Sequence, residues 1–240
     1  MTTVNQVLAI AQRELGQQEQ PTNMTKYGEW YDTNGQAWCA TFVSYCLYHA
    51  GFRLSIQPNK SDKGFGYCPS GLIWYQKCNQ WIKNSPLPGD IVFFDWENDK
   101  EANHVGLFVC QRQDGKIITI EGNSPPDDKS NGGEVRYKVR DFVADGVMGF
   151  GRPSYTSPSS VAVPVWSGER VKLASPLMKG DGIKIWQQQM IKRGYNFGAK
   201  SPDGVFGSLS EQALKKFQSQ LGFKVDGILD ALSWQAAWTA

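Results

Sequence analysis

The chain is organised around one stretch, Trp38-Cys39-Ala40-Thr41-Phe42-Val43-Ser44-Tyr45-Cys46. It follows a turn-prone Asp32-Thr33-Asn34-Gly35, and its apolar residues recur at helical spacing up to a stop at Gly51. The sequence therefore predicts a core helix with Cys39 in its first turn. Unpaired N–H groups and the positive end of the helix dipole favour the thiolate there, which is the nucleophilic form of cysteine. Simple packing of Cys39 in a core is the alternative at this point.

The overall composition indicates a globular protein. A chain of 240 residues with 40% hydrophobic residues is long enough for one large domain or two unequal ones. No apolar run reaches the roughly 18 residues needed to cross a bilayer, so we expect no membrane insertion. The first residues lack the basic and apolar regions of a secretory signal, so we expect synthesis in a cytoplasm without a signal peptide.

The cysteine content indicates free thiols. The five cysteines form no Cys-x-x-Cys pair, and an odd number fits poorly with a disulfide framework. Cys46 and Cys110 lie within apolar patterns and are expected in the core, whereas Cys68 and Cys78 are left open as paired or free. With only two histidines and no ligand spacing of a zinc site, we expect no metal.

The charge distribution suggests two modules. The net charge of +2 is too small to indicate nucleic-acid binding. Residues 1–155 hold 15 Lys/Arg and 17 Asp/Glu, and the remainder holds 10 Lys/Arg and 6 Asp/Glu. The basic second part suits an anionic polymer surface. A solvated basic face without a partner is the alternative.

The first part of the chain has helical patterns followed by strand patterns. A capping box at Thr3 and Gln6 starts a helix that ends at Gly16, a polar loop spans 17–34, and the cysteine helix follows. Residues 51–84 are predicted as loop, with a short helix after Pro69-Ser70-Gly71. Strand patterns then cover 91–94, 104–110, 116–122, 134–142 and 147–150. The predicted domain, 1–153, is α+β, with N-terminal helices packed on an antiparallel sheet.

A Ser- and Pro-rich linker, 154–170, separates this domain from a smaller one at 171–240. Three helices are predicted there, beginning at Asp181 or Gly182, at Ser208 with a capping box, and at Asp230. Two related turns precede the second and third helices: Pro202-Asp203-Gly204-Val205-Phe206-Gly207 and Val225-Asp226-Gly227-Ile228-Leu229-Asp230. This local repeat indicates a compact three-helix module.

His104 is the preferred candidate for a catalytic base. His49 falls in the last turn of the cysteine helix, where a histidine commonly contacts terminal carbonyls, whereas His104 begins a strand beside a loop. If Asp114-Gly115 is a two-residue turn, His104 lies opposite about position 125, with Glu121 and Asn123 on its side of the hairpin. Either side chain then accepts the imidazole N–H. A strand-end turn without a catalytic role is the alternative.

Four motifs of residues 1–153 are those of one known family: Trp38-Cys39-Ala40-x-Phe42-Val43-Ser44, Pro88-Gly89-Asp90-Ile91-Val92-Phe93-Phe94, His104-Val105-Gly106 and Glu121-Gly122-Asn123-Ser124. Together they resemble the CHAP domain, the cysteine, histidine-dependent amidohydrolase/peptidase family of peptidoglycan-cleaving enzymes. The resemblance implies a papain-like α+β fold. It also implies Cys39 as nucleophile, His104 as base and then acid, and Glu121 and Asn123 as polar supports.

Further site candidates surround the cysteine. Some CHAP members bind calcium in the preceding loop, and Asp32 and Asn34 are similar to that loop, but Thr41 and the scarcity of carboxylates argue against a site. We therefore expect no cofactor. The N–H of the nucleophile is expected to stabilise the oxyanion, with Tyr27 or Gln36 as the second donor. Groove-lining candidates, for which buried packing is the alternative, are Trp30, Trp38 and Trp74.

Residues 171–240 resemble the small helical peptidoglycan-binding domains, through Asp203-Gly204-Val205-Phe206-Gly207 leading into Leu214, Lys216, Phe217 and Gln218. Wall-binding candidates on this loop edge are Asp203, Gly204, Phe206 and Lys216. Core filling is expected of most of the tryptophans Trp186, Trp234 and Trp238. The two domains together resemble a bacteriophage endolysin, a monomer made in the host cytoplasm that acts on the bacterial cell wall after release.

The expected reaction is hydrolysis of a peptidoglycan amide by a cysteine nucleophile, with the enzyme held on the wall by its C-terminal domain. N-acetylmuramoyl-L-alanine amidase is the first expectation. Alternatives are an endopeptidase of the stem or cross-bridge peptides, a catalytically inactive wall-binding protein and a cysteine protease that does not act on walls. The sequence leaves open the bond cleaved and the host species.

Overall fold

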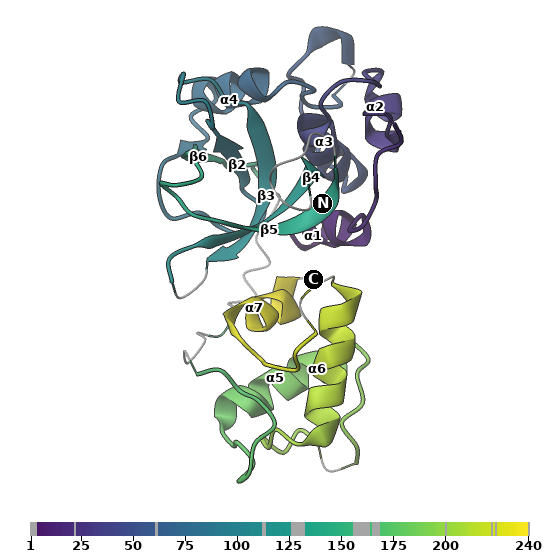
Figure 1. Ribbon diagram of the computed structural model, residues 1–240, viewed down its shortest axis with the longest axis vertical. Helices are drawn as coiled ribbons and strands as arrows, with labels where there is room; N and C mark the ends of the chain where they lie inside the picture. Colours follow the sequence, from purple (N-terminus) through teal and green to yellow (C-terminus); the bar gives the residue numbers. More distant parts are fainter. Residues whose placement is uncertain are drawn as a thin grey trace. The chain divides into compact units, whose positions relative to one another are not determined.

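The computed structural model describes residues 4–21, 23–60, 62–111, 114–125, 133–155, 164, 169–199, 201–221, 223 and 225–239. The chain divides into two units, Met1–Ser159 and Ser160–Ala240. Figure 1 shows helices beside a sheet in the first unit and helices in the second. The predicted α+β class with a small helical domain after it is confirmed. Most of the predicted linker lies outside the described residues.

The helices of the first unit come before its long strands: α1 (Val4–Arg13), α2 (Lys26–Tyr31), α3 (Cys39–His49) and α4 (Cys68–Lys77). The sequence prediction missed α2, which lies inside the predicted loop 17–34. Thr25 caps α2, because its Oγ1 accepts the Gly28 N–H at 3.0 Å. So short a helix carries no periodic apolar stripe that a sequence pattern could reveal. Thr3 of the predicted capping box lies outside the described residues.

The helices α3 and α4 both begin at a cysteine. α3 runs from Cys39 to His49 as predicted, and Gly51 follows with a φ of +93°, which suits a helix stop. α4 begins at Cys68, with Pro69 in its first turn, and extends over 10 residues. It therefore starts before the Pro69-Ser70-Gly71 turn that was predicted to precede it.

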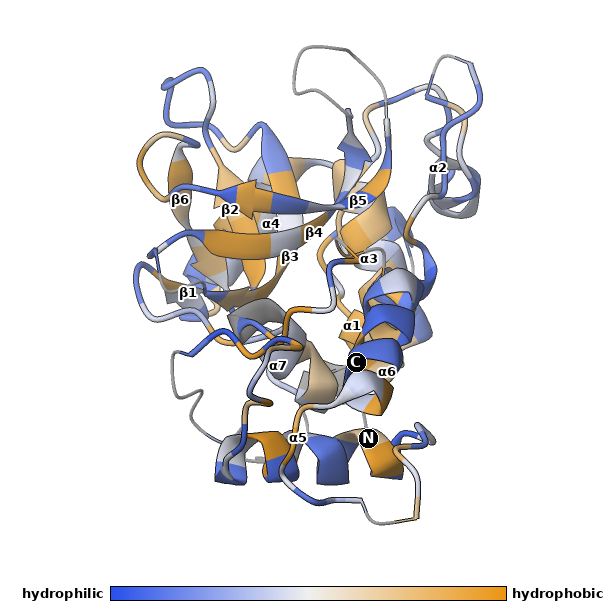
Figure 2. Ribbon diagram, turned by 60° about the horizontal axis from the view of Figure 1, so that its bottom comes forward, coloured by the Kyte–Doolittle hydropathy of each residue, from blue (hydrophilic) through white to orange (hydrophobic). Residues whose placement is uncertain are grey.

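The strands form one antiparallel sheet in the order β1-β6-β2-β3-β4-β5. Their bounds are β1 (Trp81–Ile82), β2 (Ile91–Phe94), β3 (His104–Gln111), β4 (Ile117–Ser124), β5 (Glu134–Arg140) and β6 (Val147–Gly151). The prediction included each of these strands except β1, which lies in the segment assigned as loop. Figure 2 shows apolar residues along the strands and polar residues on the connecting loops.

The helix α3 lies against β3 and β4. A glycine permits this close approach, because a Cβ at Gly122 would lie 2.7 Å from Phe42 Cβ and 2.7 Å from the Trp38 ring. Such distances are too short for any side chain to fit without a shift. The Glu121-Gly122-Asn123 segment therefore lies directly beside the start of the cysteine helix.

The register of the β3–β4 hairpin differs from the prediction. Leu107 pairs with Ile120, whereas a two-residue turn would have paired it with Gly122. The connection between the strands is longer than predicted, and a bulge in β3 shifts the register by one further residue. Because the total offset is two, Glu121 stays on the same face as His104. The prediction of a shared face thus holds for Glu121, although the predicted turn was wrong.

The second unit contains α5 (Asp181–Lys192), α6 (Ser208–Gln220) and α7 (Ala231–Thr239). The predicted cap of α7 is present, with Asp230 Oδ1 accepting the Ser233 N–H at 2.9 Å. The predicted capping box at Ser208 is wrong, because α6 starts at Ser208 with Gly207 as its cap. Core filling was expected of most of the three tryptophans, and all three are buried: Trp186, Trp234 and Trp238.

A glutamine holds each of the two repeated turns of this unit. Gln187 Nε2 donates to Asp203 Oδ1 at 3.0 Å, and the Gly204 N–H donates to Gln187 Oε1 at 2.9 Å. Gln218 makes the same two bonds in the second turn, at 3.0 and 2.9 Å. The repeat predicted from the turns therefore extends to one residue of the preceding helix.

Candidate active site

Cys39 lies where two cavities meet. It is the first residue of α3 and is 3% exposed. It lines a cavity of about 810 Å³ together with His104 and Asn123. It also lines a second cavity, of about 240 Å³, together with Cys68. The thiol is therefore buried among protein atoms but borders two hollows of the surface.

His104, at the start of β3, lines the larger cavity beside Cys39, and each of the two side chains shifts the pKa of the other. Its Nε2 lies 2.9 Å from Glu121 Oε2. A carboxylate thus holds the imidazole at the cavity that Cys39 also lines. This arrangement is the one that an activated cysteine nucleophile requires.

Glu121 is fully buried, and donors surround its carboxylate. Oε1 accepts Arg140 Nε at 2.9 Å and Thr119 Oγ1 at 2.5 Å, and Oε2 accepts Arg140 Nη2 at 2.6 Å. Burial alone would raise the pKa of Glu121, but the bonds from Arg140 and His104 hold this pKa well below its usual range. Glu121 is therefore a carboxylate at neutral pH.

Arg140 is a site residue that the sequence prediction missed. Residues 134–142 were predicted only as a strand, with no role for Arg140. In the structure Arg140 is 5% exposed, whereas Val139 is 47% exposed. The guanidinium is tolerated in the interior because Glu121 and, at 3.5 Å, Asp145 compensate its charge. An ion pair between two strands leaves no local pattern in the sequence.

Gly106 gives the Glu121 side chain its space. A Cβ at position 106 would lie 2.6 Å from Glu121 Cγ. A larger residue would therefore displace the carboxylate from His104. The His104-Val105-Gly106 motif thus supplies both the imidazole and the room for its acidic partner.

Cys39 and His104 shift each other's pKa in opposite directions. The pKa of the Cys39 thiol lies well below its usual value, because a hydrogen bond with Cys68 and the charge of His104 outweigh burial. Burial would lower the pKa of His104, but the Cys39 thiolate and Glu121 raise it to about 9. At neutral pH the pair is therefore a thiolate and an imidazolium.

Asn123 lines the larger cavity but differs from Glu121 in its environment. The register of β4 and β5 shifts between Glu121 and Ser124, and Asn123 has a φ of +54°. Its Oδ1 is buried and has no hydrogen-bond partner among the described residues. Glu121 is thus the residue of the two that holds the imidazole in this structure.

Trp96 covers the imidazole ring. Its indole stacks on His104, with ring centroids 4.5 Å apart and planes inclined by 21°, and the Arg140 guanidinium lies 5.2 Å from the indole centroid. Trp96 is 48% exposed and lines the larger cavity. The prediction missed this residue. A lone tryptophan within the charged loop 95–103 was the available signal.

Tyr27 and Trp38 belong to the core. The Tyr27 hydroxyl donates to Glu14 Oε2 at 2.7 Å and its ring is 1% exposed, so the structure does not support Tyr27 as an oxyanion donor. Trp38 is equally buried, stacks on Tyr27 with centroids 5.3 Å apart, and donates from Nε1 to Glu19 at 2.8 Å. It fills the core rather than lining a groove.

The other groove candidates also lie outside the two cavities at Cys39. Trp30 packs on Tyr45 with centroids 5.5 Å apart, and Trp74 packs on Tyr75 at 4.9 Å. Neither lines the described part of either cavity. Gln36 is exposed on the loop before α3 and stays a candidate for the oxyanion.

The side chains considered for calcium have protein partners. Asp32 Oδ2 lies 3.5 Å from Lys60 Nζ and 3.7 Å from Lys63 Nζ, and Asn34 Oδ1 accepts the Thr25 N–H at 3.0 Å. Two lysines beside Asp32 disfavour a cation there. Within the described ranges, no group of three His, Cys, Asp or Glu residues could hold a metal ion. The described helices also include none long and apolar enough to cross a membrane.

The wall-binding candidates of the second unit differ in exposure. Phe206 is fully buried and packs near Trp186, with centroids 6.0 Å apart, so its prediction as part of an exposed ligand edge is wrong. Gly204 is also buried, in the turn that Gln187 holds. Asp203 and Lys216 are exposed, and they stay candidates for contact with a ligand.

Comparisons with known proteins match the two units separately. Residues 31–123 match the family model described as CHAP domain, and residues 179–236 match the one described as putative peptidoglycan binding domain. No curated protein matches the chain. The crystal structure of a wild-type endolysin, LysIME-EF1, is similar with a TM-score of 0.41 and 16% identity, over 65% of this chain and 67% of that chain. The two family matches support a cell-wall hydrolase.

Proposed function

We propose that this chain, with its CHAP domain and its C-terminal peptidoglycan-binding domain, hydrolyses an amide bond of bacterial peptidoglycan through Cys39. One observation carries the proposal. Cys39 and His104 line the same cavity, and His104 Nε2 lies 2.9 Å from the buried Glu121 carboxylate. A nucleophile, a base and a group that orients the base are thus gathered at the edge of one cavity.

The first step is attack of the Cys39 thiolate on the amide carbonyl. The His104 imidazolium then protonates the departing amine, which leaves a thioester on Cys39 and a neutral imidazole. Neutral His104 next takes a proton from water, whose oxygen attacks the thioester. The acid product leaves and the thiolate–imidazolium pair is restored. Glu121 stays ionised throughout and stabilises the imidazolium.

The Cys39 backbone N–H is our candidate for the first oxyanion donor. It lies at the start of α3, where Trp38 provides no side-chain cap, and N–H groups there face no carbonyl of the preceding turn. Gln36, on the loop before the helix, is the candidate for the second donor. Asn123, whose buried amide oxygen has no partner among the described residues, is proposed as a second polar support.

We propose the amide between the muramoyl group and L-alanine as the bond cleaved. The exposed indole of Trp96 at the larger cavity supports this, because an aromatic face packs well on the apolar face of a sugar ring. An endopeptidase is the second candidate. The smaller cavity, which favours it, is lined by Glu97, Asp99 and Glu101, whose carboxylates suit a peptide amino group.

The second unit is proposed to hold the enzyme on the wall. Binding there raises the local concentration of substrate around the first unit. We further propose that the protein is made in a host cytoplasm and reaches the wall after release, that it acts as a monomer, and that it needs no metal or other cofactor.

Clearing of purified cell walls tests the proposal. Wild-type protein is expected to reduce the turbidity of a wall suspension, and Cys39→Ala is expected to abolish this effect. Cys78→Ala, which removes an exposed thiol of the same unit, serves as the matched control and should clear walls normally. Equal clearing by Cys39→Ala would exclude the thiol mechanism. No clearing by the wild type, together with retention on walls, would indicate a binding protein.

Mass spectrometry of the released fragments distinguishes the bonds. An amidase releases intact peptides and glycans that end in free muramic acid. An endopeptidase splits the peptides and leaves the muramoyl amide intact. Cleavage of casein without any release from walls would instead indicate a cysteine protease of another kind.

A further inference from the structure

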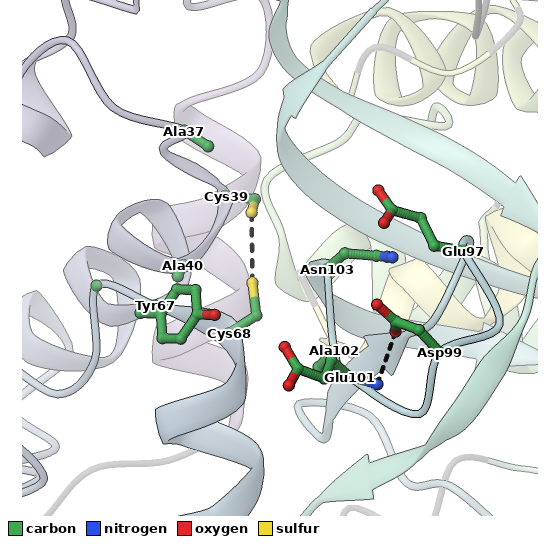
Figure 3. A pocket seen from close by; sticks show the side chains of 11 residues that line it. Ala37, Cys39, Ala40, Tyr67, Cys68, Glu97, Asp99, Glu101, Ala102 and Asn103 are labelled. Atoms are coloured by element: carbon green, nitrogen blue, oxygen red, sulfur yellow. Dashed lines mark hydrogen bonds between the residues drawn. The ribbon is translucent and has the colours of Figure 1, made fainter.

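A second thiol lies against the proposed nucleophile. Cys68 Sγ is 3.6 Å from Cys39 Sγ, and Figure 3 shows the two sulfurs facing each other across the edge of the smaller cavity. Cys68 is 5% exposed and begins α4, as Cys39 begins α3. Two helices from separate parts of the sequence thus direct their first side chains at one point.

The direction of this hydrogen bond follows from the charges. Cys39 is ionised beside His104, so its sulfur has no proton to donate. The neighbouring thiolate and burial raise the pKa of Cys68, so Cys68 keeps its proton. The 3.6 Å contact by itself allows either sulfur to donate, and with Cys39 as the thiolate the donor is the S–H of Cys68.

We propose that Cys68 is a positioning residue of the active site, whose S–H donates a hydrogen bond to the Cys39 thiolate and orients the sulfur at the meeting point of the two cavities. The proposal rests on the proposed function in that Cys39 is taken as the nucleophile. Geometry carries the proposal, because Cys68 Sγ lies 3.6 Å from the reacting sulfur and both cysteines line the smaller cavity.

This contact matters because it stabilises the thiolate and not the neutral thiol. A hydrogen bond with Cys68 and the charge of His104 both lower the pKa of Cys39. A hydrogen bond that becomes stronger when its acceptor ionises lowers the pKa of that acceptor. Cys68 thus assists His104 in keeping Cys39 ionised inside a buried site.

The alternative, a core thiol that only fills space, predicts a different response to substitution. Cys68→Ala and Cys68→Val remove the donor, and Val keeps most of the volume if the smaller residue prevents folding. Cys68→Ser keeps a donor in the form of a hydroxyl. Cys78→Ala removes a thiol just beyond α4 and is the matched control.

The experiment measures alkylation of Cys39 by iodoacetamide as a function of pH, followed by mass spectrometry of the Cys39 peptide. Only the thiolate reacts, so the midpoint reports the pKa of Cys39. Loss of the donor in Cys68→Ala or Cys68→Val is expected to raise the midpoint by about one pH unit. At a pH below the midpoint, the fraction of Cys39 that is thiolate then falls about tenfold. Cys68→Ser and Cys78→Ala should keep the wild-type midpoint.

A wild-type midpoint in the folded Ala or Val variant would overturn the proposal. So would a midpoint in Cys68→Ser shifted as far as in Cys68→Ala. This readout needs no peptidoglycan, so it is independent of wall clearing. If Cys39→Ala still cleared walls, the proposed function would fail, whereas an unchanged alkylation midpoint with normal clearing would reject the role of Cys68 alone.

Discussion

Cys39 and His104 together determine the pH range in which catalysis is expected. The thiolate–imidazolium pair exists above the lowered pKa of Cys39 and below the pKa of His104, which is about 9. Below that range the nucleophile is a neutral thiol. Above it, His104 has no proton for the departing amine. The buried ion pair titrates as one coupled system, so the limits belong to the pair.

We therefore predict a bell-shaped dependence of kcat/KM on pH, with a plateau through neutral pH and a fall near pH 9. Initial rates of wall clearing at constant ionic strength measure it. Retention of Cys39→Ala on walls at each pH is the control for changes in binding. A rate that kept rising well beyond the pKa of His104 would contradict the imidazolium as the acid.

Arg140 has its largest effect on stability. Truncation of one partner of a buried ion pair leaves the other charge uncompensated, which costs about 3–5 kcal/mol. We predict that Arg140→Ala lowers the free energy of unfolding by about this amount, measured by chemical denaturation. Arg136→Ala is the matched control on the same strand, because its pair with Glu134 is partly exposed and is expected to contribute about 1 kcal/mol or less. Equal losses of unfolding free energy in both variants would mean that the buried pair of Arg140 contributes no more to stability than the partly exposed pair of Arg136.

At the level of elements, the hairpin of β3 and β4 explains both the success and the failure of the sequence prediction. Alternation identified the strands, because β-structure has a period of two residues. It could not identify the bulge in β3 or the left-handed Asn123, since neither changes the apolar pattern. Glu121 nevertheless lies on the same face as His104. The longer connection and the bulge each shift the pairing by one residue, and a total shift of two residues restores the alternation.

The residues that were missed act through contacts distant in sequence. Arg140 reaches Glu121 from the next strand, Trp96 stacks on His104 from a loop, and Cys68 meets Cys39 from another helix. None of these contacts has a spacing that a single sequence reveals. The motif residues, by contrast, lie within short segments whose chemistry is visible locally.

Gly106 provides a test at this scale. A methyl group at position 106 would lie 2.6 Å from Glu121 Cγ, so Gly106→Ala is expected to move the carboxylate away from His104. We predict a fall in kcat of roughly 10- to 100-fold, because small displacements of catalytic groups cost about that much. The pKa of His104 should fall as well, since Glu121 helps to raise it, and this moves the alkaline limb of the pH profile to lower pH.

The control for this substitution is Gly182→Ala, where an added Cβ meets no atom within 4 Å. It should change neither the rate nor the pH profile. Circular dichroism and thermal unfolding of both variants establish that they fold. A folded Gly106→Ala protein with the wild-type alkaline limb would show that Glu121 does not need this space.

At the scale of the whole molecule, the two units have separate cores and separate polar networks. The first holds the thiol, the imidazole and the buried carboxylate, and the second holds turns fixed by Gln187 and Gln218. The excess of basic over acidic residues after Tyr155 suits a wall that carries anionic groups. If the second unit serves only to tether, its removal should alter the use of an insoluble substrate and leave the chemistry intact.

We predict that a protein ending at Tyr155 clears walls about tenfold or more slowly than the full chain at low enzyme concentration, because the gain in local concentration is lost. Its rate on a small peptidoglycan fragment, which needs no tether, should equal that of the full chain. Wall clearing measures the rate on walls, and hydrolysis of the fragment measures the rate on a small substrate. Sedimentation of the Cys39→Ala protein together with walls measures binding. Equal loss on both substrates would mean that the first unit depends on the second for its structure. Equal rates on walls would mean that the second unit does not direct this enzyme to them.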